Sequence, residues 1–127
     1  MGPDELQPRP RLVAFRDAFR GIGFMWREEP NMRFHLVAAA GVLVGAAVFQ
    51  VSTFKWVSVV LAIVVVLLAE ILNTAVEALL DLVHPDRHPL VGVVKDLAAG
   101  AVLVAAIGAT VIALVVFGPE FWDLVSR

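Results

Sequence analysis

Four polar side chains recur along one apolar segment of the chain, and they are Glu70, Asn73, Glu77 and Asp81. A helix turns by roughly 100° per residue, so this spacing places all four on one narrow stripe. An ionised glutamate at lipid depth costs several kcal/mol unless it is paired or lines a cavity, which makes such residues functional candidates. A buried glutamate could act as a general base. Polar side chains such as Asn73 also join neighbouring helices by hydrogen bonds, and this alternative stays open.

Two further polar clusters flank the apolar segments. The first contains Glu28, Glu29, Asn31, Arg33 and His35, and the second contains His88, Gly92, Lys95 and Asp96. Each cluster alone is typical of a solvated membrane boundary. Together with the stripe they combine carboxylates, which suit Mg²⁺, with a lysine that could meet phosphate. The three clusters therefore predict polyvalent-anion chemistry at one membrane surface, although the chain has no P-loop, Gly-rich dinucleotide loop or protein-kinase catalytic segment.

The composition indicates what kind of protein positions these residues. Of 127 residues, 60% are hydrophobic and 17% are charged, whereas about a quarter of the residues in a soluble domain are charged. The excess apolar material requires lipid as its solvent. The chain has no cysteine, which excludes disulfides, thiolate metal sites and a cysteine nucleophile. We therefore predict an all-α membrane protein, and we expect no nucleic-acid partner.

The N-terminal region differs from the rest of the chain. Residues 1–10 hold three prolines and little apolar content, which predicts a disordered lead. Over residues 11–28, apolar residues recur every three or four positions with arginines between them, which is typical of an amphipathic helix on a membrane surface. Gly21 and Gly23 predict a break inside this helix, because glycine in a helix interior costs about 1 kcal/mol relative to alanine.

Three transmembrane helices are predicted at about 33–51, 55–81 and 93–118. A bilayer core of about 30 Å requires about 20 apolar residues in a helix. The second segment is interrupted by Glu70 but resumes beyond it, so we expect one helix that carries the polar stripe. The link over 82–94 contains prolines and is expected to be a loop. Residues 11–127 thus form a single predicted domain.

The placement of lysine and arginine predicts the orientation. Eight of the ten lie on the side of the N-terminus and the second loop: Arg9, Arg11, Arg16, Arg20, Arg27, Arg33, Arg87 and Lys95. By the positive-inside rule, the N-terminus and this loop face the cytoplasm and the C-terminus lies outside.

Two blocks, EILNTAVEALLD at 70–81 and KDLAAGAVL at 95–103, resemble the small bacterial integral-membrane lipid kinases of the diacylglycerol kinase and undecaprenol kinase family. The resemblance runs from about Phe15 to Phe117. It implies a homotrimer of three-span subunits in the bacterial cytoplasmic membrane, with an N-terminal surface helix and active sites between subunits. It also implies a phosphotransferase with an alcohol acceptor, which transfers the γ-phosphoryl group of ATP to a lipid hydroxyl with Mg²⁺.

The same resemblance implies a role for each candidate residue. Glu70 and Asn73 would be catalytic, with Glu70 as the general base for the lipid hydroxyl and Asn73 positioning phosphate or the hydroxyl. Glu29 and Glu77 would hold Mg²⁺. Residues that would bind ATP are Gly21, through close approach, together with Glu29, Glu77, His88, Gly92, Lys95 and Asp96. Residues that would bind the lipid are Asn31, Arg33, His35 and Glu70.

The acceptor lipid is expected to be undecaprenol, because the run of Glu29, Asn31, Arg33 and His35 resembles the undecaprenol kinase branch. A diacylglycerol kinase that makes phosphatidic acid is the alternative within the family. Intramembrane glutamates also occur in ion or proton-coupled transporters, and a non-catalytic scaffold is a further alternative. Pro30 is expected to bend the chain beside Glu29.

Overall fold

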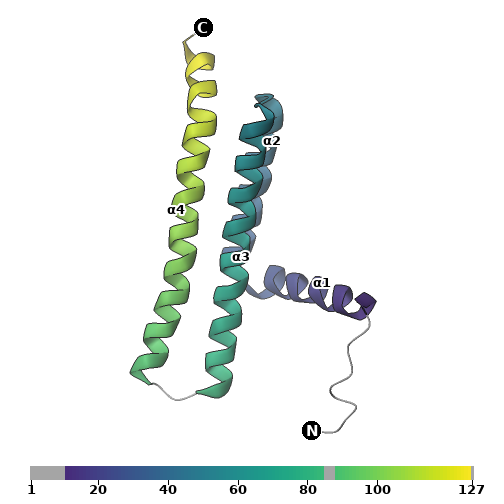
Figure 1. Ribbon diagram of the computed structural model, residues 1–127, viewed down its shortest axis with the longest axis vertical. Helices are drawn as coiled ribbons and strands as arrows, with labels where there is room; N and C mark the ends of the chain where they lie inside the picture. The colour runs from purple at the N-terminus through teal and green to yellow at the C-terminus, as the bar shows by residue number, and fades with distance from the viewer. Residues whose placement is uncertain (1–10, 85–87, 127) are drawn as a thin grey trace.

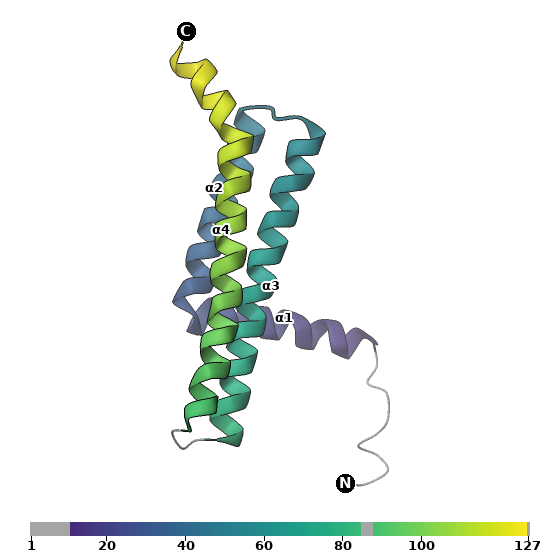
Figure 2. The same ribbon diagram turned by 60° about the vertical axis from the view of Figure 1, so that its left-hand side comes forward.

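The computed structural model describes residues 11–84 and 88–126. Its regular structure in these ranges consists of α1 (Arg11–Glu28), α2 (Pro30–Val48), α3 (Thr53–Val83) and α4 (Pro89–Val125). The last three helices are each long and apolar enough to cross a membrane. Figures 1 and 2 show these three helices running side by side, while α1 projects sideways from the foot of α2. The predicted all-helical architecture is confirmed, and the predicted lead at 1–10 lies outside the described residues.

The predicted break at Gly21 and Gly23 is wrong, because α1 is continuous from Arg11 to Glu28. The chain bends instead at Glu29, whose backbone is extended (φ −107°, ψ 105°) between α1 and α2. Glu29 precedes Pro30, and the proline ring disfavours the helical conformation of the residue before it. Proline is well tolerated in the first turn of a helix, so α2 begins at Pro30 itself. The bend expected beside Glu29 is therefore present.

A tight turn joins α2 to α3. Gln50 has a left-handed φ of 50°, its N–H donates to the Ala47 carbonyl at 3.2 Å, and the Val51 N–H donates to the Ala46 carbonyl at 3.2 Å. These two bonds form a Schellman motif, which satisfies carbonyls that the end of α2 leaves free. Ala46 and Val51 are both buried in the apolar core at this end of the bundle.

The link between α3 and α4 is shorter than expected. The predicted loop covered 82–94, but α3 continues to Val83 and α4 already begins at Pro89. Pro89 occupies the first turn of α4, and His88 precedes it as the N-cap, where Nδ1 accepts from the Leu90 N–H at 3.2 Å. Residues 89–94 are helical because the proline starts this helix rather than breaking it.

Most apolar side chains of the three long helices face outward. The buried core comprises Ala46, Val51, Val59 and Val116, whereas large apolar residues such as Phe34, Leu72 and Val104 are mostly exposed on the single chain. Burying such surface contributes about 25 cal/mol per Å². These faces therefore require hydrocarbon, or the apolar surface of another chain, as their surroundings.

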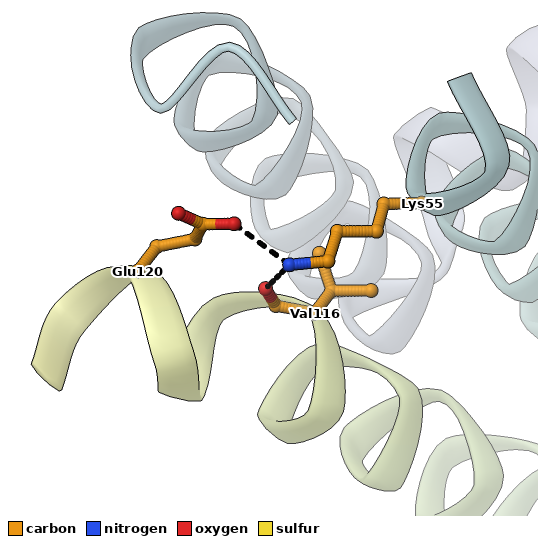
Figure 3. Close-up of polar contacts among 3 residues, drawn as sticks. All are labelled: Lys55, Val116 and Glu120. Atoms are coloured by element: carbon orange, nitrogen blue, oxygen red, sulfur yellow. Dashed lines mark hydrogen bonds and ion pairs between the residues drawn. The ribbon is translucent and has the colours of Figure 1, made fainter. Parts of the chain in front are cut away.

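An ion pair sets the register of α3 and α4 near the α2–α3 turn. Figure 3 shows Lys55, from the start of α3, reaching Glu120 on α4. Lys55 Nζ donates to Glu120 Oε1 at 2.7 Å and to the Val116 carbonyl at 3.2 Å. Pro119 lies inside α4, which extends to Val125 rather than ending near 118, and Figure 2 shows the helix bending near this end. Proline is tolerated within membrane helices because neighbouring groups satisfy the freed backbone.

Removing this ion pair should destabilise the bundle. We expect Glu120→Gln to lower the free energy of unfolding by about 1–2 kcal/mol, because a partly buried ammonium loses its charged partner. Reversible unfolding in mixed detergent micelles would measure the change. Ser58→Ala is the matched control, since the Ser58 hydroxyl bonds only to the Phe54 carbonyl of its own helix. Equal unfolding free energies for Glu120→Gln and the unsubstituted protein would contradict a stabilising role for the pair.

Candidate active site

Glu70 is the buried end of the polar stripe. It lies on α3 and is 4% exposed, and no other charged residue in the described part of the chain is buried. Its Oε1 lies 3.1 Å from Nε2 of His35, which comes from the second turn of α2. A carboxylate among apolar helices requires a partner of this kind. The structure thus brings together two residues that are far apart in the sequence and that both belong to the predicted lipid site.

Asn73 and Glu77 follow on the same face of α3. Asn73 Nδ2 donates to Glu77 Oε1 at 3.1 Å. The other amide atom, Asn73 Oδ1, is buried and has no hydrogen-bond partner among the described residues. Buried polar atoms in native proteins are nearly always satisfied. Asn73 Oδ1 therefore has capacity for a donor or a cation that the described residues do not supply.

Asp81 and Lys95 mark the exposed end of the stripe. Lys95, on α4, donates through Nζ to Asp81 Oδ1 at 2.5 Å across the α3–α4 hairpin. The sequence interpretation placed Asp81 on the stripe but assigned it no role in the nucleotide site. The spacing of Asp81 after Glu77 was the feature of the sequence that indicated its place on the stripe. Its pairing with Lys95 could not be predicted in this way, because it depends on how α3 and α4 fold back on each other.

The stripe as a whole leads from the apolar interior to solvent. Asp81 lies eleven positions after Glu70, or about 16 Å along a helix. The Glu70 side chain is 5% exposed and the Asp81 side chain is 66% exposed. Figure 1 shows α3 and α4 extending past the level of α1 on this side of the molecule. Such a gradient suits a reaction between an apolar substrate and a water-soluble one.

Glu29 lies at the junction of α1 and α2 and is partly buried. No ion pair or hydrogen bond joins its side chain to Glu77 within residues 11–84 and 88–126. The same residues contain no group of three His, Cys, Asp or Glu side chains arranged around one cation. Mg²⁺ commonly takes only one or two protein carboxylates and shares its other positions with phosphates and water. On α3, the Glu77 carboxylate and the unpartnered Asn73 Oδ1 offer oxygen donors of the kind this ion takes.

The other predicted site residues lie at the same end of the bundle but share no polar contact with the stripe in the described chain. A Cβ added at Gly21 or Gly92 would meet nothing within 4 Å, so the close approach expected at Gly21 involves no part of the described chain. Asp96 lines a shallow apolar groove on α4. The remaining predicted site residues are Asn31 and Arg33, exposed on α2, and His88, exposed at the N-cap of α4.

An apolar cavity of about 100 Å³ lies between α2, α3 and α4, next to His35. Among the described residues that line it, His35 is the one polar residue. Small side chains create much of the space, and they are Ala38, Ala39, Ala62, Ala109 and Ala113. The cavity extends from His35 towards the α2–α3 turn, away from the exposed end of the stripe. Sequence periodicity alone did not indicate it, because it depends on how three helices pack.

Comparison with known proteins agrees with the resemblance seen in the sequence. The family model described as prokaryotic diacylglycerol kinase matches residues 16–117. The chain is 39% identical over 107 residues to the undecaprenol kinase of Bacillus subtilis, covering 84% of this chain and 87% of that protein. It is 35% identical over 102 residues to a diacylglycerol kinase of Synechocystis, covering 80% and 58%. It is 32% identical over 94 residues to the diacylglycerol kinase of Escherichia coli K12, covering 74% and 77%.

Proposed function

The chain belongs to the prokaryotic diacylglycerol kinase family and is a membrane lipid kinase, and from this premise we propose that it transfers the γ-phosphoryl group of ATP to undecaprenol with Mg²⁺. One observation carries the proposal. A buried carboxylate, Glu70, begins a polar stripe that ends at the exposed Asp81–Lys95 pair. A lipid hydroxyl could approach Glu70 from the membrane, while a nucleotide approaches the Asp81–Lys95 pair from water.

In the proposed reaction, Glu70 accepts the proton of the acceptor hydroxyl as its oxygen attacks the γ-phosphorus. The bond from that phosphorus to the bridging oxygen breaks, and ADP leaves. Phosphoryl transfer requires mainly positioning and neutralisation of charge from a protein. Lys95 supplies positive charge for the phosphates, and Asn73 orients a phosphate oxygen or the hydroxyl. Glu29 and Glu77 are the residues that would hold Mg²⁺, which neutralises phosphate charge when bound.

The choice of undecaprenol rests on two features. The run of Asn31, Arg33 and His35 resembles the undecaprenol kinase branch, and the undecaprenol kinase of Bacillus subtilis is similar over 87% of its own length. Apart from His35, the described residues that line the cavity are apolar, so the cavity suits the hydrocarbon next to the hydroxyl of the acceptor lipid. Diacylglycerol is the alternative acceptor, because other relatives carry that name.

We also propose that the enzyme is a homotrimer with active sites between subunits. The extensive exposed apolar surface of the long helices supports contacts with other copies or with lipid. In the proposed topology α1 lies on the cytoplasmic surface of the bacterial cytoplasmic membrane, the α3–α4 link is cytoplasmic, and the C-terminus lies outside.

A transport function is less well supported by the distribution of polar groups. A path across the membrane would need free polar side chains at the end of the bundle beyond Glu70. The Ser58 and Thr110 hydroxyls there bond to carbonyls of their own helices. These hydroxyls are therefore already satisfied in the way that single polar residues commonly are in membrane helices.

A phosphorylation assay tests the acceptor. Purified protein in detergent would receive radiolabelled ATP, Mg²⁺ and, separately, undecaprenol, diacylglycerol, ceramide or glycerol. We expect kcat/KM for undecaprenol to exceed that for diacylglycerol, with glycerol essentially inert, because an alcohol without a tail lacks the binding energy that positions its hydroxyl. A reversed order would assign diacylglycerol as the acceptor. Labelling of none of these lipids would contradict the proposed reaction.

A further inference from the structure

His35 occupies a junction between the proposed base and the apolar cavity. Its Nε2 lies 3.1 Å from Glu70 Oε1, and its side chain also lines the cavity of about 100 Å³. We propose that His35 is a positioning residue: it holds one oxygen of Glu70 so that the other can take the proton of the acceptor hydroxyl. This role rests on the proposed function of Glu70 as the base.

The contact with His35 restricts the freedom of the Glu70 carboxylate. The terminal torsion of a glutamate is broad and has no sharply preferred value. A contact to Oε1 restricts it and defines which oxygen remains for substrate. Within residues 11–84 and 88–126, no hydrogen bond or ion pair engages Glu70 Oε2. A carboxylate held in this way is already oriented before the lipid arrives, which is how a protein lowers the cost of reaching a reactive geometry.

The contact between His35 and Glu70 also joins two helices. His35 comes from α2 and Glu70 from α3. In the described part of the chain, theirs is the one polar contact between side chains of these two helices. Both side chains are largely buried, at 17% and 5% exposed. A buried polar contact has a defined geometry because the surrounding apolar side chains cannot replace it. The position of Glu70 therefore depends on α2 as well as on its own helix.

The cavity beside His35 has room for hydrocarbon. An apolar cavity of about 150 Å³ can hold benzene, so a space of about 100 Å³ is sufficient for a smaller hydrocarbon fragment. Among the described residues that line this space, His35 is the one polar residue. His35 thus lies where the hydrocarbon and the hydroxyl of the acceptor would meet.

Steady-state kinetics of His35 variants test the positioning role. We expect His35→Ala to lower kcat about tenfold, the effect of losing one polar contact to a carboxylate, with the KM for ATP unchanged. His35→Gln should retain most activity, because its Nε2 can occupy nearly the same place as the imidazole Nε2. His35→Asn is one methylene shorter and should resemble His35→Ala. Comparison of the Gln and Asn variants distinguishes loss of the contact with Glu70 from a general loss of folding.

A double-mutant cycle shows whether His35 acts through Glu70. In the Glu70→Gln background, His35→Ala should have no further effect on kcat. Val37→Ala, an exposed change on the same helix, serves as a control and should stay within about twofold of the unsubstituted enzyme. Equal kcat losses from His35→Ala in both backgrounds, or equal activity of the Gln and Asn variants, would overturn the positioning role alone. An unsubstituted enzyme that phosphorylates no lipid would overturn the proposed function instead.

Discussion

Glu70→Gln is expected to lower kcat for lipid phosphorylation by about 10² or more, the usual contribution of a general base. Glutamine has nearly the same shape as glutamate, but its amide cannot accept the hydroxyl proton in the same way. Glu70 is 4% exposed, so water has little access to replace it. Initial rates with saturating ATP and lipid would measure the change. The KM for ATP should stay near its original value, because Glu70 lies at the end of the stripe opposite to Lys95.

Glu120→Gln is the matched control for this substitution. It makes the same chemical change at a partly buried glutamate at the other end of the bundle, where Glu120 pairs with Lys55. We expect it to reduce stability but to leave kcat unchanged at a temperature where the protein is folded. Near-original turnover in Glu70→Gln would contradict the assignment of the base. A similar loss in both variants would indicate that loss of folding, rather than of proton transfer, is being measured.

Glu77→Ala is expected to raise the Mg²⁺ concentration for half-maximal activity by about 10² or more. Changes to groups that merely support metal ligands weaken metal binding by about 10–100-fold, and Glu77 is proposed as a ligand itself. Glu29→Ala should have a similar effect. Because both residues are proposed to hold one ion, the double variant should lose less than the product of the two single effects. Titration of Mg²⁺ in the assay, and of Mn²⁺ by electron paramagnetic resonance, would measure the affinities.

Asp123→Ala is the control for the metal titration. Asp123 is an exposed carboxylate near the far end of α4, so its removal changes the net charge by the same amount without touching the stripe. We expect its Mg²⁺ dependence to match that of the unsubstituted enzyme. If both Glu29→Ala and Glu77→Ala also keep the original dependence, the proposed metal ligands are wrong.

The helices could be predicted largely from the sequence because hydropathy and helical periodicity are local properties. The apolar runs indicated three membrane-spanning helices, and the regular spacing from Glu70 to Asp81 placed the polar residues on one face. The ends of the helices were less accurate. Pro89 begins α4 instead of belonging to a loop, Pro119 lies within that helix, and α1 runs through Gly21 and Gly23. Pro89 follows the preference of proline for the first turn of a helix, whereas the glycines of α1 and Pro119 lie inside helices despite their low helix propensity.

The sequence by itself therefore determined the number and type of helices, the family resemblance and the residue types available for chemistry. Only the tertiary structure decided the partners: His35 for Glu70, Asp81 for Lys95 and Glu120 for Lys55. The members of the last two pairs are 14 and 65 residues apart. Such contacts depend on the rotation and vertical register of one helix against another, which hydropathy does not specify. Close packing of side chains selects one arrangement, and that arrangement places a histidine from α2 beside the buried glutamate of α3.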